Sequence, residues 1–298
     1  MKKRAIVLLV LLMALTLQIA EAEPMLYRVN GEKGTLYLLP TIHFGNEEMV
    51  SALETRVLPT VKNADRLAVE IDDAVTQSMS GSLRLNLAIR YDNKEIASNH
   101  LARETYEQAK ALLKRAGMDY SMFDGIRAQY WPALCENAIC MLGGMRADQG
   151  VDRIVMKYAR ENGVNIEGME TVDEQITLLL SPSDALTDWL LQETVSDPDA
   201  AAARYAAMPA MFVAGDGETL YAANKLDLSG VPADIEEEAR QYYDMMLRQR
   251  DDRFEERAVR YLSEDKTTVL MVGALHIIGE NGLIDRLQNA GYQVELLK

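Results

Sequence analysis

The chain has few of the residues that usually build metal and redox sites. Only two of its 298 residues are cysteine and only three are histidine. Cys135 and Cys140 are too few for a zinc pattern. Both lie in "PALCENAICML", which has a helical pattern, and residues five positions apart on a continuous helix point in different directions. A disulfide between them would need a break in that helix, and two separate thiols are the alternative.

Positive charge is also scarce. Lysine and arginine together number 31 against 46 acidic residues, which gives a formal net charge of −15 at pH 7. A surface with this charge repels nucleic acid and anionic lipid, so we exclude both as partners.

Long hydrophobic runs are missing after the first 22 residues. Those residues begin with three basic side chains at 2–4, continue with an apolar run over 5–19 and end in Ala-Glu-Ala at Ala22. The run is shorter than the roughly 20 residues that a spanning helix needs, and the small residues after it are typical of a signal-peptidase site. We expect cleavage after Ala22 and a periplasmic or secreted protein without stable membrane insertion.

Several motifs that would define a function are absent from the sequence. It contains no Gly-rich phosphate loop, no Gly-x-Ser-x-Gly elbow, no His-Glu-x-x-His segment and no calcium loop. No internal repeat and no linker rich in Pro, Gly or Ser divides the chain after its first 22 residues. Residues 23–298 are therefore predicted to form a single domain.

The pattern of apolar residues predicts strands at both ends of the domain and helices between them. "MLYRVNGEKGTLYLLPT" indicates a hairpin with a five-residue connection, and a helix over 46–63 followed by the strand "DRLAVEID" favours a parallel pair. Helical patterns fill about 100–163 and 172–262, with the short strand "GVNIEGME" between them. "TTVLMVGALH" predicts a strand, "GLIDRLQNAGY" a helix and "QVELLK" a last strand. The expected fold is α/β, a mainly parallel central sheet with an N-terminal hairpin and a large helical insertion.

Polar side chains stand at the ends of four predicted strands. His43 ends the second hairpin strand, Glu70 the next strand, Glu170 the middle strand and His276 the long late strand. In open parallel sheets, ligand sites form beyond the carboxyl ends of the strands. Neighbouring strands lie about 4.8 Å apart, so we expect these four side chains to converge.

Two imidazoles and a carboxylate form a ligand set for a divalent metal such as Mn²⁺, Co²⁺ or Zn²⁺. His43, His276 and Glu70 are the candidate ligands, and Glu170 is then a candidate general base. A single histidine is more often a structural residue, and this reading stays open for each of the two. His100, before a predicted helix, is interpreted as a surface residue.

Arg250 lies on the inward face of a predicted helix. The apolar residues of that helix recur at intervals of three and four, and the same spacing includes Arg250. A buried arginine needs a carboxylate or a ligand as its partner. A structural salt bridge and a substrate anion are both open as that partner.

The sequence resembles the TraB/GumN family, which includes the Tiki proteases, and more distantly the erythromycin-esterase-like and ChaN-like proteins. The resemblance runs from "TLYLLPTIHFGN" through "ADRLAVEID", "QGVDRIVMKYARENGVNIEGMETVDEQ" and "RQRDDRF" to "VGALHIIGENGLIDRLQNAGYQVELL". The family signature is a pair of Gly-x-x-His motifs with a glutamate between them. Here "GALH" ending at His276 matches the second motif, Glu70 the early glutamate and Glu170 the acid of the Leu-Glu-Thr segment.

Two positions depart from the family pattern. The first motif reads "PTIH", with Pro40 where the family usually has glycine, and the Glu-Arg-Asn segment reads "QRD", which keeps only Arg250. Proline removes a backbone N–H and fixes φ, so the departure affects the expected activity more than the expected fold.

The resemblance implies an α/β fold with both histidines in one cleft and, in the Tiki branch, metal-dependent peptide cleavage. Our leading hypothesis is an exported metal-dependent hydrolase of peptides, with a metal on His43, His276 and Glu70. Glu170 would act as base or orienting residue, and Arg250 would hold a substrate carboxylate or an oxyanion. The alternatives are a non-catalytic protein that binds haem, a porphyrin or another small anion, and a degenerate member with an interaction role. A homo-oligomer is compatible with each hypothesis.

Overall fold

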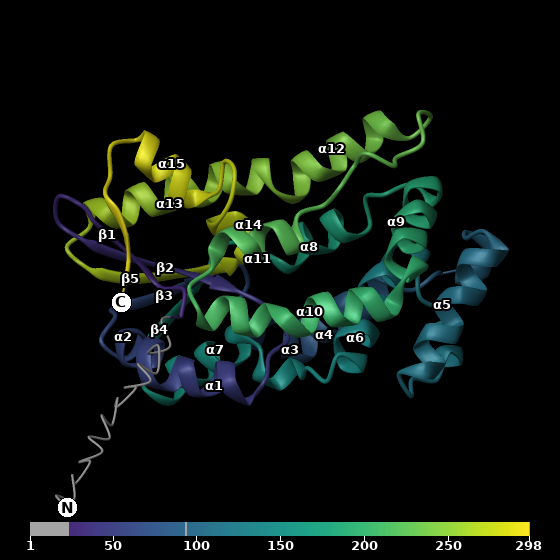
Figure 1. Cartoon of the computed structure of the whole chain (residues 1–298), viewed down its shortest axis with the longest axis horizontal. Helices are drawn as coiled ribbons and strands as arrows, with labels where there is room; N and C mark the ends of the chain where they lie inside the picture. The colour runs from purple at the N-terminus through teal and green to yellow at the C-terminus, as the bar shows by residue number, and fades with distance from the viewer. Residues whose placement is uncertain (1–23, 93, 298) are drawn as a thin grey trace, which may run out of the picture.

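The computed structural model describes residues 24–92 and 94–297, and a six-stranded mixed sheet forms its centre (Figure 1). The signal peptide predicted for 1–22 lies outside these residues. The strands run in the spatial order β4-β3-β5-β2-β1-β6. Their bounds are β1 Tyr27–Asn30, β2 Thr35–Thr41, β3 Arg66–Val69, β4 Asn165–Gly168, β5 Thr267–Gly273 and β6 Val294–Leu296.

The prediction of a mainly parallel sheet with an N-terminal hairpin is confirmed. Strands β4, β3, β5 and β2 are mutually parallel, and only β1 and β6 join by antiparallel pairing. The central strand β5 is buried from Thr268 to Val272, which explains its unbroken apolar run. The hairpin connection is one residue shorter than expected, because Asn30 already pairs with Thr35.

Pro40 fits inside β2 because this part of the strand pairs with a neighbour on one side only. It lies opposite Val272 of β5, whereas β1 accompanies β2 only as far as Leu38. Proline cannot donate to a strand ladder and is tolerated where a strand has a neighbour on one side. The departure from the family glycine is thus compatible with the sheet.

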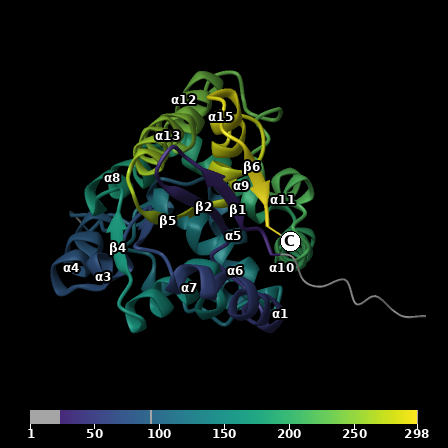
Figure 2. The ribbon, with the colours of Figure 1, turned by 90° about the vertical axis from the view of Figure 1, so that its left-hand side faces the viewer.

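Helices cover both faces of the sheet (Figure 2). Helices α13 and α15 lie on one face and α1, α2 and α7 on the other (Figures 1 and 2), and all five contribute to the main apolar core. The helix bounds are α1 Glu47–Ala52, α2 Leu58–Lys62, α3 Asp73–Gln77, α4 Met79–Ala88, α5 Arg103–Arg115, α6 Trp131–Leu142, α7 Val151–Glu161, α8 Val172–Leu179, α9 Asp184–Ser196, α10 Pro198–Val213, α11 Gly217–Asn224, α12 Glu236–Met246, α13 Arg248–Ser263, α14 Ala274–Ile277 and α15 Leu283–Asn289.

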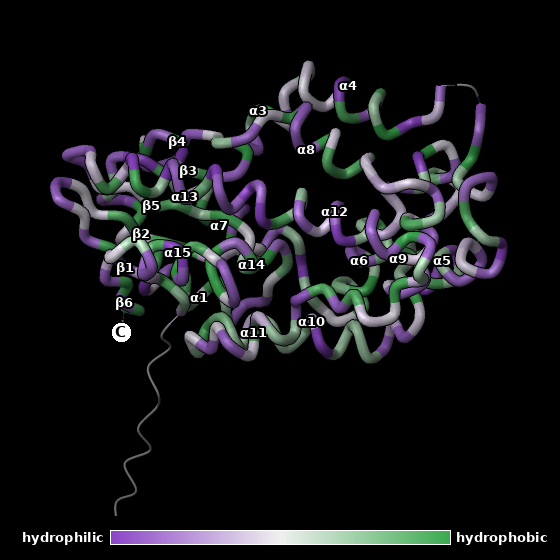
Figure 3. Tube along the Cα trace, turned by 90° about the horizontal axis from the view of Figure 1, so that it is seen from above, coloured by the Kyte–Doolittle hydropathy of each residue, from purple (hydrophilic) through white to green (hydrophobic). Residues whose placement is uncertain are grey.

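The helical part extends away from the sheet and has a core of its own. Helices α5, α6 and α9 pack around buried Trp131 at the end of the molecule opposite the sheet (Figure 3). Cys135 and Cys140 lie on the unbroken helix α6 as free thiols. Within the described residues, no helix is both long and apolar enough to cross a membrane.

Three local details differ from the sequence-based expectation. Helices α3 and α4 occupy 73–88, where no helix was predicted. The long helix predicted around Arg250 is broken at Leu247, and α13 begins at the next residue, Arg248. The last predicted strand residues after Gly273 form the single helical turn α14, which carries His276.

Candidate functional site

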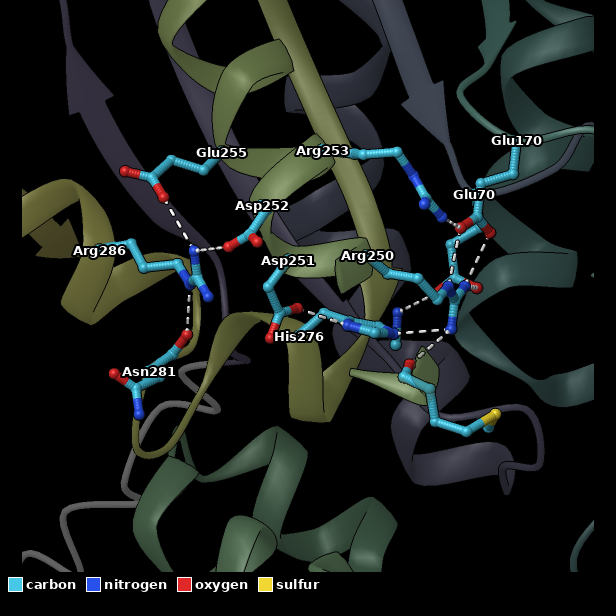
Figure 4. A network of polar contacts seen from close by, with 12 residues as sticks. Glu70, Glu170, Arg250, Asp251, Asp252, Arg253, Glu255, His276, Asn281 and Arg286 are labelled. Carbon is cyan, nitrogen blue, oxygen red and sulfur yellow. Dashed lines mark hydrogen bonds and ion pairs between the residues drawn. The ribbon is translucent and has the colours of Figure 1, made fainter. Parts of the chain in front are cut away.

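The carboxyl ends of the four parallel strands meet at one edge of the sheet. Glu70 directly follows β3, Glu170 follows β4 by two residues, and His276 lies on the turn after β5. Arg250 reaches the same place from the first turn of α13 (Figure 4). Glu70, Glu170 and His276 therefore converge as expected. Arg250 from α13 lies between them and adds a positive charge.

Arg250 is buried and uses every donor of its guanidinium. Nε and Nη2 donate to the two oxygens of Glu170 at 2.7 and 2.8 Å, and Nη2 also donates to Glu70 Oε2 at 2.6 Å. Nη1 donates to His276 Nε2 at 2.9 Å and to the carbonyl oxygen of Met246 at 3.3 Å. Of the two partners left open for this inward arginine, a structural salt bridge and a substrate anion, the structure shows the salt bridge, with carboxylates of the chain itself.

Glu170 holds the arginine in place from the α8 side. Its side chain is 2% exposed, and Arg253 donates to it at 3.2 Å from the solvent side. The next residue, Thr171, begins α8 with a capping box that it shares with Glu174. This cap fixes the backbone directly after Glu170, and Gln175 of α8 donates to Glu170 Oε2 at 3.2 Å.

Glu70 is an ionised carboxylate held by two donors. Besides Arg250, the backbone N–H of Gly273 donates to Glu70 Oε1 at 2.6 Å. Burial alone would raise the pKa of Glu70, but Arg250, His276, the Gly273 N–H and His43 together lower that pKa to about 2.

His276 and Asp251 form a buried pair beside the arginine. His276 Nδ1 lies 2.6 Å from Asp251 Oδ1, and both side chains are 5% exposed. A guanidinium only donates, so His276 Nε2 accepts from Arg250 and Nδ1 carries the hydrogen that faces Asp251. Burial raises the pKa of Asp251, against the opposing effects of His276, Arg286 and Arg250. Sequence reasoning missed Asp251, which it treated only as a departure from the family asparagine.

His43 lies apart from this network. Its side chain is 73% exposed, and its Nδ1 lies 3.4 Å from Asp152 Oδ2 at the start of α7. Asp152 is the main reason that the pKa of His43 is raised, to about 9. Val151 donates to the carbonyl of Ile42, which fastens the start of α7 to the end of β2. Among the described residues, no hydrogen bond or ion pair joins His43 to Glu70 or His276.

Both histidines nevertheless line one cavity of about 300 Å³. Glu70, Arg250 and His276 belong to its lining, and its other lining residues include Phe44, Glu136, Cys140, Tyr205, Met208 and Met246. Its volume is at the lower end of the range for small-molecule sites. Burial raises the pKa of Cys140 to about 12, so this thiol stays protonated at neutral pH and is no nucleophile there.

Gly273 allows Glu70 to approach the backbone. A Cβ at this position would lie 3.3 Å from Glu70 Oε1 and 3.5 Å from a ring carbon of His276. Gly273→Ala should therefore displace Glu70 and lower the free energy of unfolding by about 1–3 kcal/mol. Urea unfolding tests this, with Gly230→Ala as control because a Cβ there meets nothing within 4 Å. Equal stability of the two variants would contradict the expectation.

The arrangement does not provide the predicted metal-ligand set. His276 engages Asp251 and Arg250 with its two nitrogens, and Glu70 engages Arg250 and Gly273 with its two oxygens. Within 24–92 and 94–297, no group of three His, Cys, Asp or Glu side chains is placed to hold an ion. The guanidinium of Arg250 instead provides the positive charge between these groups.

These features define an α/β protein with a polar site at the carboxyl edge of a parallel sheet. The chain belongs to the TraB/PrgY/gumN family, whose family model matches residues 25–296. It is 24% identical over 173 residues to the uncharacterized protein YbaP of Escherichia coli K12, a match that covers 54% of this chain and 62% of YbaP. An uncharacterized protein of Treponema pallidum is 21% identical over 166 residues, with 56% and 49% covered. The matches thus span less than two thirds of each relative, and no solved structure matches the chain.

Proposed function

We propose that this chain is a peptide hydrolase in which His276 activates the attacking water. The observation that carries the proposal is the buried Asp251–His276 pair, whose imidazole lines the cavity. A base whose second nitrogen is held by a carboxylate is the arrangement that general-base catalysis needs, because it fixes both the tautomer and the ring orientation.

In the resting arrangement, the lone pair of His276 Nε2 is occupied by an Arg250 N–H. A substrate carbonyl that enters the cavity would accept this N–H in place of the imidazole. The freed Nε2 would then take a proton from water as its oxygen attacks the carbonyl carbon. Arg250 would stabilise the negative oxygen that develops, and His276 would return the proton to the leaving amine as the C–N bond breaks.

Glu70 and Glu170 have a positioning role in this proposal. The two oxygens of Glu170 and one of Glu70 hold the guanidinium on its far side, so that Nη1 remains directed toward His276. Of the two roles predicted for Glu170, base or orienting residue, its contacts favour the second. No step is assigned to a metal, because the donor set described above does not fit one.

We also propose that the leader predicted for residues 1–22 directs this activity to the periplasm or outside the cell. Binding of haem or another small anion and an interaction role remain predictions that none of these contacts favours.

The test is cleavage of a mixture of short peptides by purified residues 23–298, followed by mass spectrometry. We expect cleavage that persists in a chelator and disappears in His276→Ala. His100→Ala is the matched control, because His100 lies between Glu95 and Asp184 and does not line the cavity. Chelator-sensitive cleavage would restore the metal hypothesis, and equal activity of wild type and His276→Ala would reject the proposal.

A further inference from the structure

Glu136 is an acidic side chain on the cavity wall that sequence reasoning did not single out. It lies on α6, and the side chains of Asn137 and Cys140 from the same helix line the cavity with it. By surface area Glu136 is exposed, and the cavity borders its side chain. Burial by the surrounding protein raises the pKa of this carboxyl, against the effects of His43 and Arg204.

The other charged groups of the cavity already have partners. Arg250 lies between Glu70 and Glu170, and His43 lies beside Asp152. Among the described residues, Glu136 has no hydrogen bond and no ion pair, although His43 is near enough to act on its charge. The cavity lining therefore contains one carboxylate without a direct counter-charge, and this negative charge attracts a cation that enters with the ligand.

The size of the cavity restricts what this cation can be. About 300 Å³ is at the lower end of the range for ligand sites, so the cavity takes the end of a peptide rather than a long central stretch. The end of a peptide that carries positive charge is its N-terminal ammonium group.

We propose that Glu136 binds the N-terminal ammonium group of the substrate, so that the site acts on peptides with a free amino terminus. The inference rests on the proposed hydrolase and assigns its substrate class. Asn137, the next residue on α6, also lines the cavity. Arg250 and His276 would then meet a carbonyl close to this end of the chain.

The test compares peptides that differ only in the amino terminus. Glu136→Gln keeps the shape of the side chain and removes its charge. We expect it to raise the KM for a free-amino peptide by about 10- to 100-fold, because the amide oxygen still accepts from the ammonium but the negative charge that strengthens this hydrogen bond is lost. The KM for the N-acetylated peptide should stay unchanged. Glu54→Gln, the same change at an exposed residue outside the cavity, should leave both values unchanged.

Two results would overturn the inference. An equal KM of wild type for both peptides would show that the ammonium is not recognised. A loss of kcat in Glu136→Gln for both peptides, with KM unchanged, would show that Glu136 moves a proton instead.

A binding measurement separates this inference from the proposed function. Calorimetry measures the binding of alanyl-alanine amide and of its N-acetyl derivative to two proteins, the His276→Ala variant and the His276→Ala/Glu136→Gln double variant. Binding of the free-amino form alone, lost in the double variant, supports the ammonium site even if no peptide is cleaved by wild type. Cleavage without this preference in binding would instead retain the hydrolase and reject Glu136 as its ammonium site.

Discussion

Asp251→Leu should lower the kcat for peptide cleavage by about 10²- to 10³-fold. Leucine has a similar size but cannot accept the hydrogen on His276 Nδ1, which Asp251 accepts at 2.6 Å. The ring would lose the partner that orients it and that stabilises its protonated form during the reaction. The measurement is kcat against the same peptide for wild type and variant, with thermal unfolding to confirm that the variant folds.

Asp251→Asn distinguishes orientation from charge. Its amide oxygen can still accept from Nδ1–H, and Arg250 continues to donate to Nε2, so the tautomer is kept. We therefore expect a loss nearer tenfold, from the missing negative charge alone. Asp252→Asn is the control, because Asp252 is exposed and pairs with Arg286 instead of His276. If the leucine variant were as active as this control, His276 would not be the base.

The placement of the site could be predicted because it follows from strand direction. Parallel strands present their carboxyl ends at one edge, so residues that follow three apolar runs had to lie near one another. The inward position of Arg250 was also predictable, since the spacing of three and four on its helix includes the apolar face. Its burial and its carboxylate partners confirm that part of the prediction.

The difference between the two histidines was not predictable from matched positions. His276 follows β5 on a helical turn that directs it under α13, beside Asp251, with Phe254 packed edge-on against its ring. His43 follows β2 in a segment without such a turn, and it stays exposed beside Asp152. Side-chain direction after a strand depends on a few local dihedral angles, which apolar periodicity does not encode. Asp251 was missed for a related reason. The predicted helix was continuous, whereas the break at Leu247 makes α13 a separate helix, and the direction of Asp251 depends on where that helix begins.

Arg250→Met should lower the free energy of unfolding at pH 7 by about 3–5 kcal/mol. The change removes the positive charge that Glu70 and Glu170 share, and it leaves a buried carboxylate at Glu170 and a partly buried one at Glu70 without it. Arg250→Lys should also be destabilised, because one ammonium cannot make the bidentate contact and reach the other partners. Urea unfolding of the three proteins measures the differences.

The pH dependence identifies the cause of this loss. The pKa of Glu70 is about 2 in the folded wild type against an ordinary 4.5, so its stabilising contribution is full above 4.5 and is lost as pH falls toward 2. In Arg250→Met, burial without the arginine raises the pKa of Glu70. Protonation of Glu70 as pH falls then removes the unpaired negative charge that destabilises the variant. The stability difference between the two proteins should therefore shrink in acid. Arg253→Met, at a 49% exposed arginine that also contacts Glu170, should cost less than about 1 kcal/mol. An Arg250→Met variant no less stable than this control, or a difference independent of pH, would show that the buried charges are not what holds the site together.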